Sequence, residues 1–427
     1  MKKRILAFVL GLGMVLGLAA CGGGSSSSTA STGSGSTSAA DPSDFMVGAI
    51  YINSRNDTAG YTYAHHNGIT TAMEELGLDP ETQLSIVDNV PEEYDQVASA
   101  VDTLVGNGCD IIFGISFGYM QAMADKAEDY PDVIFSHATG YMSNETNFNN
   151  YFGRAYQARY LAGIAAGLKS LETGNNNVGY VAAYGRQYAE TASGINGFAL
   201  GVQAVNPDAT VYVKELGAWA DEVNEGAFAR ELIQSFGCGV ISQHCDSAQP
   251  QIAAQDLGVY GCGYNSDMTA DAPQAHLTAA IWHWNVYYHT AIETAMSCES
   301  ADQFVEKMGG QAYYGGLAEG FVGVSPLNEA TVAPGTQEAI DQVTDLIVSG
   351  EWDVFTGTKL HITVGEDGAV TIEQEEAPLM SDGKELVDGE LVDAASAEIV
   401  PAGGESVEDS VITGSMNYFV EGVVSAN

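Results

Sequence analysis

The sequence predicts an α/β protein of two doubly wound lobes with a ligand cleft between them. From residue 45 onward, short and nearly continuous apolar runs alternate with helical stretches, as in parallel sheets that are buried on both faces. The same alternation begins again near residue 155. A body of this length is sufficient for two domains. Loops at the carboxyl ends of such strands meet at a crevice, which is where we expect a ligand.

The first unit is predicted from four apolar runs and the helical patterns between them. We expect strands at 45–51, 84–90, 110–115 and 133–137, and helices at 61–76, 92–106 and 119–129. Gly77 directly follows the first of these helices, where a glycine commonly ends a helix. The order of elements is that of successive βαβ units.

The second unit repeats this order over a similar length. We expect strands at 178–183, 211–216, 239–243 and 259–263, and helices at 156–169, 189–205, 222–236 and 248–256. A strand at 276–281 and helices at 284–296 and 336–349 follow this unit. Pro207 lies just beyond the helix at 189–205, as is usual after a helix end. These elements predict a second parallel sheet with helices on both faces.

A strongly acidic segment follows the second unit. Residues 366–409 contain fourteen acidic residues and one basic residue, Lys384. Strand-like alternation at 360–364 and 369–372 flanks Asp367-Gly368, a hairpin signal. We expect the rest of the stretch at about 360–412 to be a solvated, partly mobile insertion.

The first 44 residues have the pattern of an export signal and a tether. Three basic residues precede an almost unbroken apolar run at 5–18, which is too short to span a bilayer comfortably. The run ends in Leu18-Ala19-Ala20-Cys21, which resembles the bacterial lipobox and implies cleavage before Cys21 and diacylation of its thiol. An ordinary signal peptide with an incidental cysteine is the alternative. Residues 22–44 are almost wholly Gly, Ser, Thr and Ala, which predicts a flexible tether.

The charge of the chain excludes some classes of function. Its net charge is −42, from 14 Lys+Arg and 56 Asp+Glu. Nucleic-acid binding needs clustered cations, so we expect no nucleic-acid partner. The sequence has no GxxxxGK phosphate loop, so we do not expect it to hydrolyse ATP.

The cysteines and histidines do not form a recognisable metal site. Five cysteines follow Cys21 at irregular spacing, and three of them lie in apolar, strand-like stretches that favour small buried thiols. A bridge between Cys238 and Cys245 remains open. The histidines at 65, 66, 283 and 289 lack the spacing and carboxylate of a helical zinc site, and an exposed helix face is expected for them. We predict neither a metal nor another cofactor.

Several sequence blocks resemble one family of lipoproteins, the basic membrane protein family. The blocks are Asn53-Ser54-Arg55-Asn56-Asp57, Ala59 to Gly68, Ser116-Phe117-Gly118-Tyr119-Met120, His137 to Tyr141, Gln243 to Ser247, Gly263 to Met268, Gly350 to Gly357 and Met416 to Val423. This family is the purine nucleoside-binding branch of the bilobed substrate-binding proteins of ABC transporters. The resemblance covers most of the chain after residue 45, and only the acidic stretch at about 360–412 is longer than usual.

The resemblance implies two Rossmann-like lobes of the periplasmic binding protein type I fold. In such proteins the chain crosses between the lobes three times, and we expect crossings near residues 152, 280 and 322. The first lobe would comprise 45–152 and 281–322, and the second 153–280 and 323–427. The expected partners are a purine small molecule, an ABC permease with a separate ATPase, and the membrane through the lipid anchor. The expected location is the extracytoplasmic face of the cell membrane.

Ten residues of these blocks and their neighbourhood are candidates for ligand contact. They are Asn53, Asn56, Tyr61, Phe117, Tyr119, Trp219, Asp246, Asn265, Asp267 and Trp284. A purine needs aromatic faces for stacking and convergent donors and acceptors at its edges. The resemblance implies that Tyr61 and Trp219 supply the stacking faces, one from each lobe.

The remaining candidates have edge-binding or wall-forming roles. Carboxylate and amide groups of Asp246, Asn265 and Asp267 would bind ring nitrogens, exocyclic nitrogens or ribose hydroxyls. Phe117 and Tyr119 would line the wall, Asn53 and Asn56 would close the first loop, and Trp284 would add a further wall. For Tyr61 and Trp219 the alternative is packing between lobes, and for Asp267 it is capping of a helix or turn.

The stretch Ile281 to Tyr288 departs from the nucleoside-binding pattern. Many nucleoside binders have a lysine here, and this sequence has none. The absence of a lysine favours a free nucleobase, such as adenine, over a nucleoside.

Two other functions compete with solute import. Gly114-Ile115-Ser116-Phe117-Gly118 matches the GxSxG nucleophile elbow of serine hydrolases, and Asp246 or Asp267 with His276 or His283 would supply the order of a triad. However, no HGGG-type oxyanion loop precedes the motif, and only two strands come before its own. The second alternative is a sensor that presents its ligand to a receptor, or a surface lipoprotein with a non-purine ligand.

Overall fold

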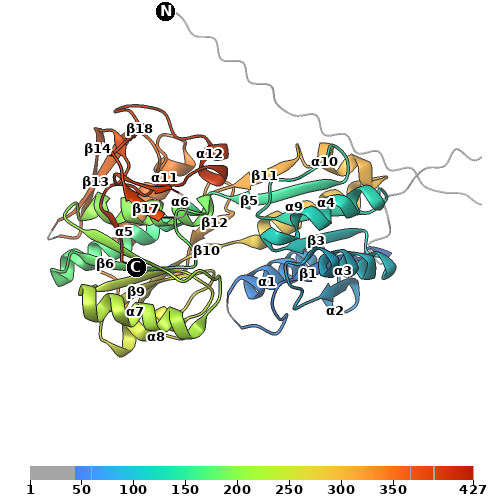
Figure 1. Ribbon diagram of the computed structural model, residues 1–427, viewed down its shortest axis with the longest axis horizontal. Helices are drawn as coiled ribbons and strands as arrows, with labels where there is room; N and C mark the ends of the chain where they lie inside the picture. The colour runs from blue at the N-terminus through green and yellow to red at the C-terminus, as the bar shows by residue number, and fades with distance from the viewer. Residues whose placement is uncertain (1–43, 59, 366, 388–389, 427) are drawn as a thin grey trace, which may run out of the picture. The chain divides into compact units, whose positions relative to one another are not determined.

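The computed structural model describes residues 44–58, 60–365, 367–387 and 390–426 (Figure 1). The predicted signal peptide, Cys21 and residues 22–43 of the predicted tether lie outside these residues. Within the described ranges, no helix combines the length and apolar character needed to cross a membrane. As the sequence predicts, the chain forms an α/β protein of two lobes, and each lobe is built on one large sheet.

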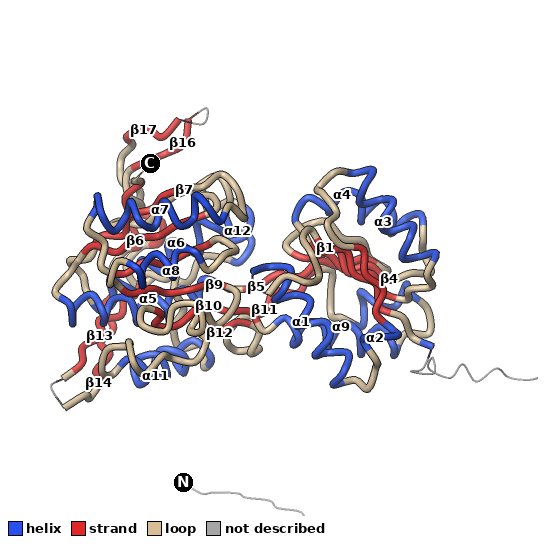
Figure 2. The backbone as a smooth tube through the Cα atoms, turned by 90° about the horizontal axis from the view of Figure 1, so that it is seen from below, coloured by secondary structure: helices blue, strands red, loops and turns tan. Residues whose placement is uncertain are grey.

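The sheet of the first lobe has six parallel strands in the order β11-β5-β4-β3-β1-β2. Its strands are β1 Val47–Tyr51, β2 Leu84–Val87, β3 Ile111–Ile115, β4 Ile134–Ala138, β5 Phe148–Gly153 and β11 Ala312–Gly315. Its helices are α1 Gly60–Glu75, α2 Pro80–Gln83, α3 Tyr94–Gly106, α4 Met120–Asp129, α9 Trp284–Ser297 and α10 Phe304–Lys307, with the 3₁₀ turns η2 Phe117–Tyr119 and η3 Ala301–Gln303. Figure 2 shows α3 and α4 on one side of the central strands and α1 and α9 on the other. Strands β1, β3 and β4 are fully buried because apolar layers cover both faces.

The sheet of the second lobe has seven strands in the order β12-β10-β9-β8-β6-β7-β19. Its strands are β6 Asn177–Ala182, β7 Thr210–Glu215, β8 Val240–His244, β9 Tyr260–Tyr264, β10 His276–Trp282, β12 Val322–Val324 and β19 Val423–Ser425. Strand β12 runs antiparallel to β10, and the other neighbours are parallel. Its helices are α5 Ala155–Thr173, α6 Ala189–Val205, α7 Glu222–Phe236, α8 Gln249–Asp256 and α11 Thr336–Val348. Helices α5, α6 and α11 share one hydrophobic core with the sheet, and α7 and α8 share another.

Helices α5 and α6 approach each other unusually closely because glycines line their contact. A Cβ added to Gly201 would lie 2.1 Å from the carbonyl oxygen of Tyr160. A Cβ on Gly163 would lie 2.2 Å from the carbonyl oxygen of Phe198. These distances are shorter than van der Waals contact, so the two backbones can pack this way only without side chains at these positions.

The chain passes between the two sheets at three places. It leaves the first sheet after β5 and enters α5, and it returns after β10 to form α9. The third passage connects β11 of the first sheet with β12 of the second. The carboxyl ends of the strands in both sheets supply the loops that are described below.

The C-terminal part adds small sheets and one helix to the second lobe. Its elements are β13 Thr358–Val364, β14 Val370–Glu376, β15 Leu379–Met380, β16 Lys384–Val387, β17 Glu390–Asp393, β18 Glu398–Val400 and α12 Asp409–Gly414. Strands β13 and β14 form the predicted hairpin, with Val364 opposite Val370. Most described residues of the remainder are exposed, as expected for a solvated insertion, but a few positions pack against the second lobe. Leu379, Val400 and Ile412 are buried in the core of the second lobe, and Arg186 forms a buried ion pair with Asp382.

Candidate functional site

A pocket of 280 Å³ lies where loops of the two lobes meet. It is lined by Ile52, Asn53, Tyr61, Ser116, Phe117 and Thr139 from the first lobe, and by Tyr184, Glu190, Ala218, Trp219, Ala220, Asp246 and Tyr264 from the second. These residues come from strand ends, from the segments that follow them, or from the first turns of α1 and α6. Open parallel sheets commonly bind ligands in this position.

Aromatic side chains form much of the pocket wall. Tyr61 and Phe117 belong to the first lobe, and Tyr184, Trp219 and Tyr264 belong to the second. The rings of Tyr184 and Trp219 pack edge to face with centroids 5.1 Å apart. A flat ligand between the lobes would therefore meet aromatic surface from both sides.

Two carboxyl groups of the second lobe complete the pocket. Burial raises the pKa of Asp246 to about 7, and the nearby carboxyl groups of Glu225 and Glu190 add to the effect. Burial also raises the pKa of Glu190 to about 7, although the charge of Arg159 opposes this shift. Near neutral pH these two groups can therefore accept hydrogen bonds as carboxylates or donate them as carboxylic acids.

The loop that carries Asp246 is fixed by groups around it. The amide nitrogen of Asn265 donates to Oδ1 of Asp246 at 3.1 Å. Beneath the loop, the buried carboxylate of Glu225 accepts hydrogen bonds from the backbone N–H groups of Asp221 and Ser247, at 2.8 and 3.0 Å. These contacts hold Asp246 at the pocket edge.

Asp246 also touches the first lobe. Gly60 begins α1 with a φ of +83°, and a Cβ there would lie 2.9 Å from the carbonyl oxygen of Asp246. The backbone N–H of Tyr61, at the start of the same helix, lowers the pKa of Asp246 in opposition to burial. The helix N-terminus of one lobe thus faces a carboxylate of the other.

A buried cation lies behind the pocket. Arg159 is on α5, is 1 % exposed, and donates to the backbone carbonyl of Gln243. Its guanidinium group lies 3.8 Å from the ring centroid of Tyr264, which lines the pocket. A buried charge is costly unless opposite charges lie near it. The partial ionisation of Glu190 and the ring of Tyr264 supply such compensation.

A larger chamber of 910 Å³ shares part of its wall with the pocket. The shared residues are Phe117, Thr139, Tyr184, Glu190 and Trp219. Helix α12 lines the chamber with residues between 409 and 414. The C-terminal part of the chain therefore contributes to the surroundings of the site.

Six of the ten predicted residues lie at this site. Asn53, Tyr61, Phe117, Trp219 and Asp246 line the pocket, and Asn265 contacts it through Asp246. Asn265 has a positive φ of 66°, which few residues other than glycine adopt and which directs its amide toward Asp246.

The other four predicted residues do not line the pocket. Tyr119 is buried in the first lobe, and its hydroxyl donates to the carbonyl oxygen of Val90 at 2.6 Å. Asn56 is exposed in the loop after β1. Asp267 is exposed and accepts a hydrogen bond from the backbone N–H of Thr269, which is the capping alternative considered above. Trp284 belongs to the core between α1 and α9.

His65, the stacking partner of Trp284, is not on an exposed helix face as we expected. The ring of Trp284 stacks on His65 with centroids 3.8 Å apart. His65 is fully buried, and its Nδ1 lies 2.7 Å from the hydroxyl oxygen of Tyr288. An exposed position is therefore wrong for this histidine. Burial lowers its pKa well below the usual range.

Several pocket residues were missed from the sequence. Tyr184 and Glu190 follow β6, Ser116 and Thr139 follow β3 and β4, and Tyr264 ends β9. Their position after predicted strands was a usable signal. Arg159 gave no such signal because it lies inside a helix rich in Ala and Gly.

Neither a disulfide nor a metal cluster occurs in the described part of the chain. Cys109, Cys238, Cys245 and Cys262 are buried free thiols, and Cys298 is a partly exposed one. The open possibility of a Cys238–Cys245 bridge is therefore excluded in this structure. No group of three or more His, Cys, Asp or Glu side chains in the described ranges is arranged to hold a metal ion.

Comparison with known proteins relates this architecture to solute transport. Residues 45–354 match the family described as ABC transporter substrate-binding protein PnrA-like. A protein of Haloferax volcanii that is assigned as the glucose-binding protein of an ABC transporter is 35% identical over 315 residues, which cover 72% of this chain and 73% of that protein. A purine-binding protein of Brucella abortus is 34% identical over 312 residues, which cover 73% of this chain and 83% of that protein.

Solved structures share the fold at lower sequence identity. A solute-binding protein of an ABC transporter from Conexibacter woesei aligns with a TM-score of 0.59 at 21% identity, covering 72% of this chain and 98% of that protein. A second one, from Aeropyrum pernix, aligns with a TM-score of 0.58 at 18% identity, covering 76% and 94%. Both likenesses support the bilobed periplasmic binding protein fold.

The GxSxG motif has a structural role in this architecture. The hydroxyl of Ser116 donates to Oε1 of Glu92 at 2.5 Å, and the same oxygen accepts the N–H of Gly118 at 2.7 Å.

Substrate-binding proteins of ABC importers are not enzymes. They bind a small molecule outside the cytoplasm and deliver it to a permease that a separate ATPase drives. By the match over residues 45–354, the chain belongs to this PnrA-like family of ABC transporter substrate-binding proteins.

Proposed function

We propose that this protein captures a purine nucleobase, such as adenine, or a purine nucleoside in the pocket between its lobes. The observation that carries the proposal is the combination of aromatic walls from both lobes with two carboxyl groups whose pKa values are near 7. The purine-binding relative from Brucella abortus, which is 34% identical, supports the same ligand class.

A purine suits the chemistry of this pocket. Its flat ring would stack between Tyr61 or Phe117 on one side and Trp219 on the other. Its edge carries both N–H donors and ring-nitrogen acceptors. An ionised Asp246 would accept from an N–H group, and a protonated Glu190 would donate to a ring nitrogen. The volume of 280 Å³ is near the lower end for small-molecule sites and suits a compact ligand.

The proposed mechanism is capture by closure of the two lobes. The two lobes would move as rigid bodies about the three crossing segments. The first lobe comprises 45–152 with 281–322, and the second comprises 153–280 with 323–427. A ligand that contacts both lobes favours the closed form, because only that form offers both sets of contacts. Cys21 would anchor the protein to the membrane through lipid, and residues 22–44 would form the tether.

A sugar is the second candidate ligand. The 35% identical relative from Haloferax volcanii is assigned as a glucose-binding protein. Carboxylates and amides beside aromatic rings can also bind sugar hydroxyl groups. Glucose therefore has to be tested beside the purines.

The deciding experiment identifies the ligand directly. The purified protein is denatured, and released small molecules are identified by ultraviolet absorbance and mass spectrometry. Adenine, other purines, purine nucleosides and glucose are then added singly in a thermal-shift assay. A ligand at about a thousand times its Kd stabilises the folded state by about 4 kcal/mol, which is easily detected. A shift with glucose and none with any purine would contradict the purine proposal.

Variants locate the ligand in the pocket. Trp219→Ala and Asp246→Ala should abolish the purine-induced shift with little change in the melting temperature without ligand, because both side chains are only partly buried at the pocket edge. Tyr94→Ala, an exposed aromatic residue on α3, is the matched control and should retain the shift. Normal binding by both pocket variants would place the ligand elsewhere.

A further inference from the structure

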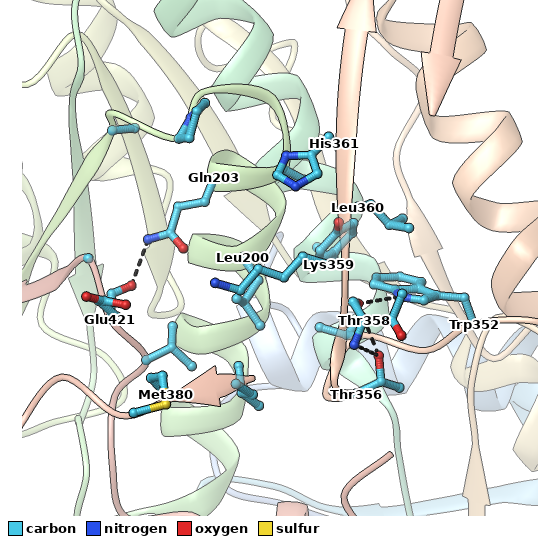
Figure 3. A pocket seen from close by; sticks show the side chains of 18 residues that line it. Leu200, Gln203, Trp352, Thr356, Thr358, Lys359, Leu360, His361, Met380 and Glu421 are labelled. Atoms are coloured by element: carbon cyan, nitrogen blue, oxygen red, sulfur yellow. Dashed lines mark hydrogen bonds between the residues drawn. The ribbon is translucent and has the colours of Figure 1, made fainter. Parts of the chain in front are cut away.

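A second pocket lies wholly in the second lobe and shares no residue with the pocket between the lobes (Figure 3). Its volume is 320 Å³. It lies between α6, the first strand of the β13–β14 hairpin and the backbone around Val420 to Gly422. The family match ends at residue 354, and much of this wall comes from later residues. The C-terminal part therefore creates a cavity that the matched part alone does not contain.

The walls of this pocket are more apolar than polar. They include Tyr160, Leu200, Trp352, Leu360 and Leu379. The rings of Tyr160 and Trp352 have centroids 5.1 Å apart, and the indole N–H of Trp352 donates to the carbonyl oxygen of Thr358 at 2.8 Å. That hydrogen bond fixes the indole ring, so the aromatic surface is available for an apolar ligand without rearrangement.

Lys359 is the exceptional residue of the pocket. Eight of the other lysines and arginines in the described ranges form ion pairs with carboxylates: Arg55, Lys126, Arg154, Lys169, Arg186, Lys214, Arg230 and Lys384. Arg159 and Lys307 donate to backbone carbonyls. Among the lysine and arginine side chains of those same ranges, that of Lys359 alone has neither an ion pair nor a hydrogen bond.

The free ammonium group is directed into the cavity. Figure 3 shows the side chain of Lys359 extending from β13 across the pocket toward Leu200 on α6. In a chain with a net charge of −42, carboxylates are abundant, yet this exposed cation is not paired with one. Its position over apolar surface provides a charged contact for an anion whose body fills the cavity.

Two other polar side chains around the pocket are engaged within the protein. The amide nitrogen of Gln203 donates to the carbonyl oxygen of Glu421 at 2.8 Å, as Figure 3 shows. His361 lies 2.6 Å from the carboxylate of Glu375, measured from Nε2 to Oε2. The carboxylate of Glu421 also lines the pocket, and it would repel an anion, so Lys359 is the group that a ligand carboxylate would contact.

We infer that this pocket binds a small organic monocarboxylate with a flat or branched apolar body. The volume lies within the range of small-molecule sites. The single free cation matches one carboxylate, and the apolar walls match the remainder of the molecule. A multiply charged anion such as phosphate is disfavoured because the protein as a whole repels it and the pocket offers one free cation beside the carboxylate of Glu421.

Indole-3-acetate is a suitable probe because it joins a flat ring to one carboxylate. Its binding to the full-length protein is measured by isothermal titration calorimetry, with the neutral analogue indole-3-acetamide in parallel. We expect indole-3-acetate to bind and the amide to bind at least tenfold more weakly. Lys359→Gln should weaken binding of the carboxylate about tenfold and leave the melting temperature unchanged, because Lys359 is exposed and makes no internal hydrogen bond. Lys307→Gln, on α10 of the first lobe, is the control and should bind as the wild type does.

A further variant separates this site from the pocket between the lobes. Trp219→Ala should retain binding of indole-3-acetate. Failure of the wild type to bind indole-3-acetate at millimolar concentration would overturn the inference. Equal binding of the acid and the amide, unchanged affinity in Lys359→Gln, or loss of binding in Trp219→Ala would also overturn it.

Discussion

At the scale of single residues, the site depends on two carboxyl groups that share one pocket. Burial raises the pKa of both Asp246 and Glu190 to about 7, far above the usual range near 4. The folded protein therefore binds more protons than the unfolded chain between about pH 4 and pH 7. In this window, the contribution of these groups to the free energy of unfolding falls as the pH rises. Both groups thus oppose folding at neutral pH, which is characteristic of residues that are retained for function.

The same pKa values predict a pH dependence of purine binding. A purine N–H that donates to Asp246 stabilises the carboxylate, so the bound protein has the lower pKa. Below about pH 7, Asp246 must lose its proton when the purine binds. The Kd should therefore rise by up to about tenfold for each pH unit by which the pH falls. Calorimetric titration with adenine between about pH 5.5 and pH 8 measures this directly.

Asp246→Asn should weaken adenine binding and remove the rise in Kd below about pH 7, whereas the rise in Kd above about pH 7, where Glu190 ionises, should remain. Asp267→Asn should leave the profile unchanged because Asp267 lies outside the pocket. A wild-type Kd that is constant over the whole pH range would contradict a role for these carboxyl groups in ligand binding.

The residue scale also shows how far sequence reasoning reaches into the site. The rule that ligand-binding residues follow strand ends selected Asn53 and Asp246, and the structure places both residues in the pocket lining. It does not separate Phe117 from Tyr119, since two residues of one 3₁₀ turn face pocket and core respectively. The direction of a side chain within a tight turn depends on backbone angles and on the tertiary partner, here the carbonyl of Val90, and neither can be predicted from the residue types.

At the scale of elements, helices with a clear hydrophobic periodicity could be predicted from the sequence. Strands that depend on partners far along the chain could not. The expected helices at 189–205 and 222–236 coincide with α6 and α7. Strand β5 was missed because it contains two asparagines, and burial of Asn149 depends on hydrogen bonds with the hydroxyl of Tyr287, far along the chain. Strand β19 was missed because three residues give no local signal and its partner β7 lies about 200 residues earlier.

The glycines between α5 and α6 give a prediction at this scale. Gly201→Ala should reduce the free energy of unfolding by about 1–3 kcal/mol, because the new Cβ would overlap the carbonyl oxygen of Tyr160. Urea denaturation measures the change. Gly106→Ala at the end of α3 is the control, since no atom lies within 4 Å of its added Cβ, and it should be neutral or stabilising. Equal stability of the wild type and Gly201→Ala would show that the helices can separate without cost.

At the scale of the whole molecule, one arginine connects the crossing segments with the C-terminal part. Arg154 lies directly after β5, at the first passage between the sheets. Its Nε donates to Asp409 of α12 at 3.1 Å, and its Nη1 donates to the carbonyl oxygen of Tyr314 at 3.1 Å. Glu319, in the third passage, lies 3.8 Å away. Arg154 therefore joins the first and third passages between the sheets to α12.

This ion pair lies within the second lobe, beside the passages between the sheets. Its loss should free Arg154 and α12 at these passages and thereby loosen the arrangement in which Gly60 and Asp246 touch across the lobes. We expect Asp409→Asn to increase the radius of gyration of the ligand-free protein in small-angle X-ray scattering. Purine affinity should fall several-fold, because part of the binding free energy then goes into closing the lobes. Asp95→Asn, on the exposed surface of α3, should change neither quantity. An unchanged radius and an unchanged Kd in Asp409→Asn would show that the ion pair does not influence closure.

The position of β19 has a consequence for how the protein matures. Strand β7 pairs with β6 on one side and with β19 on the other, and about 200 residues separate β7 from β19 along the chain. Until β19 has formed, the outer edge of β7 has unpaired N–H and C=O groups that could pair with another molecule. Completion of the second sheet thus requires closure of a long loop, and before that closure the exposed edge of β7 is a site at which the chain would aggregate.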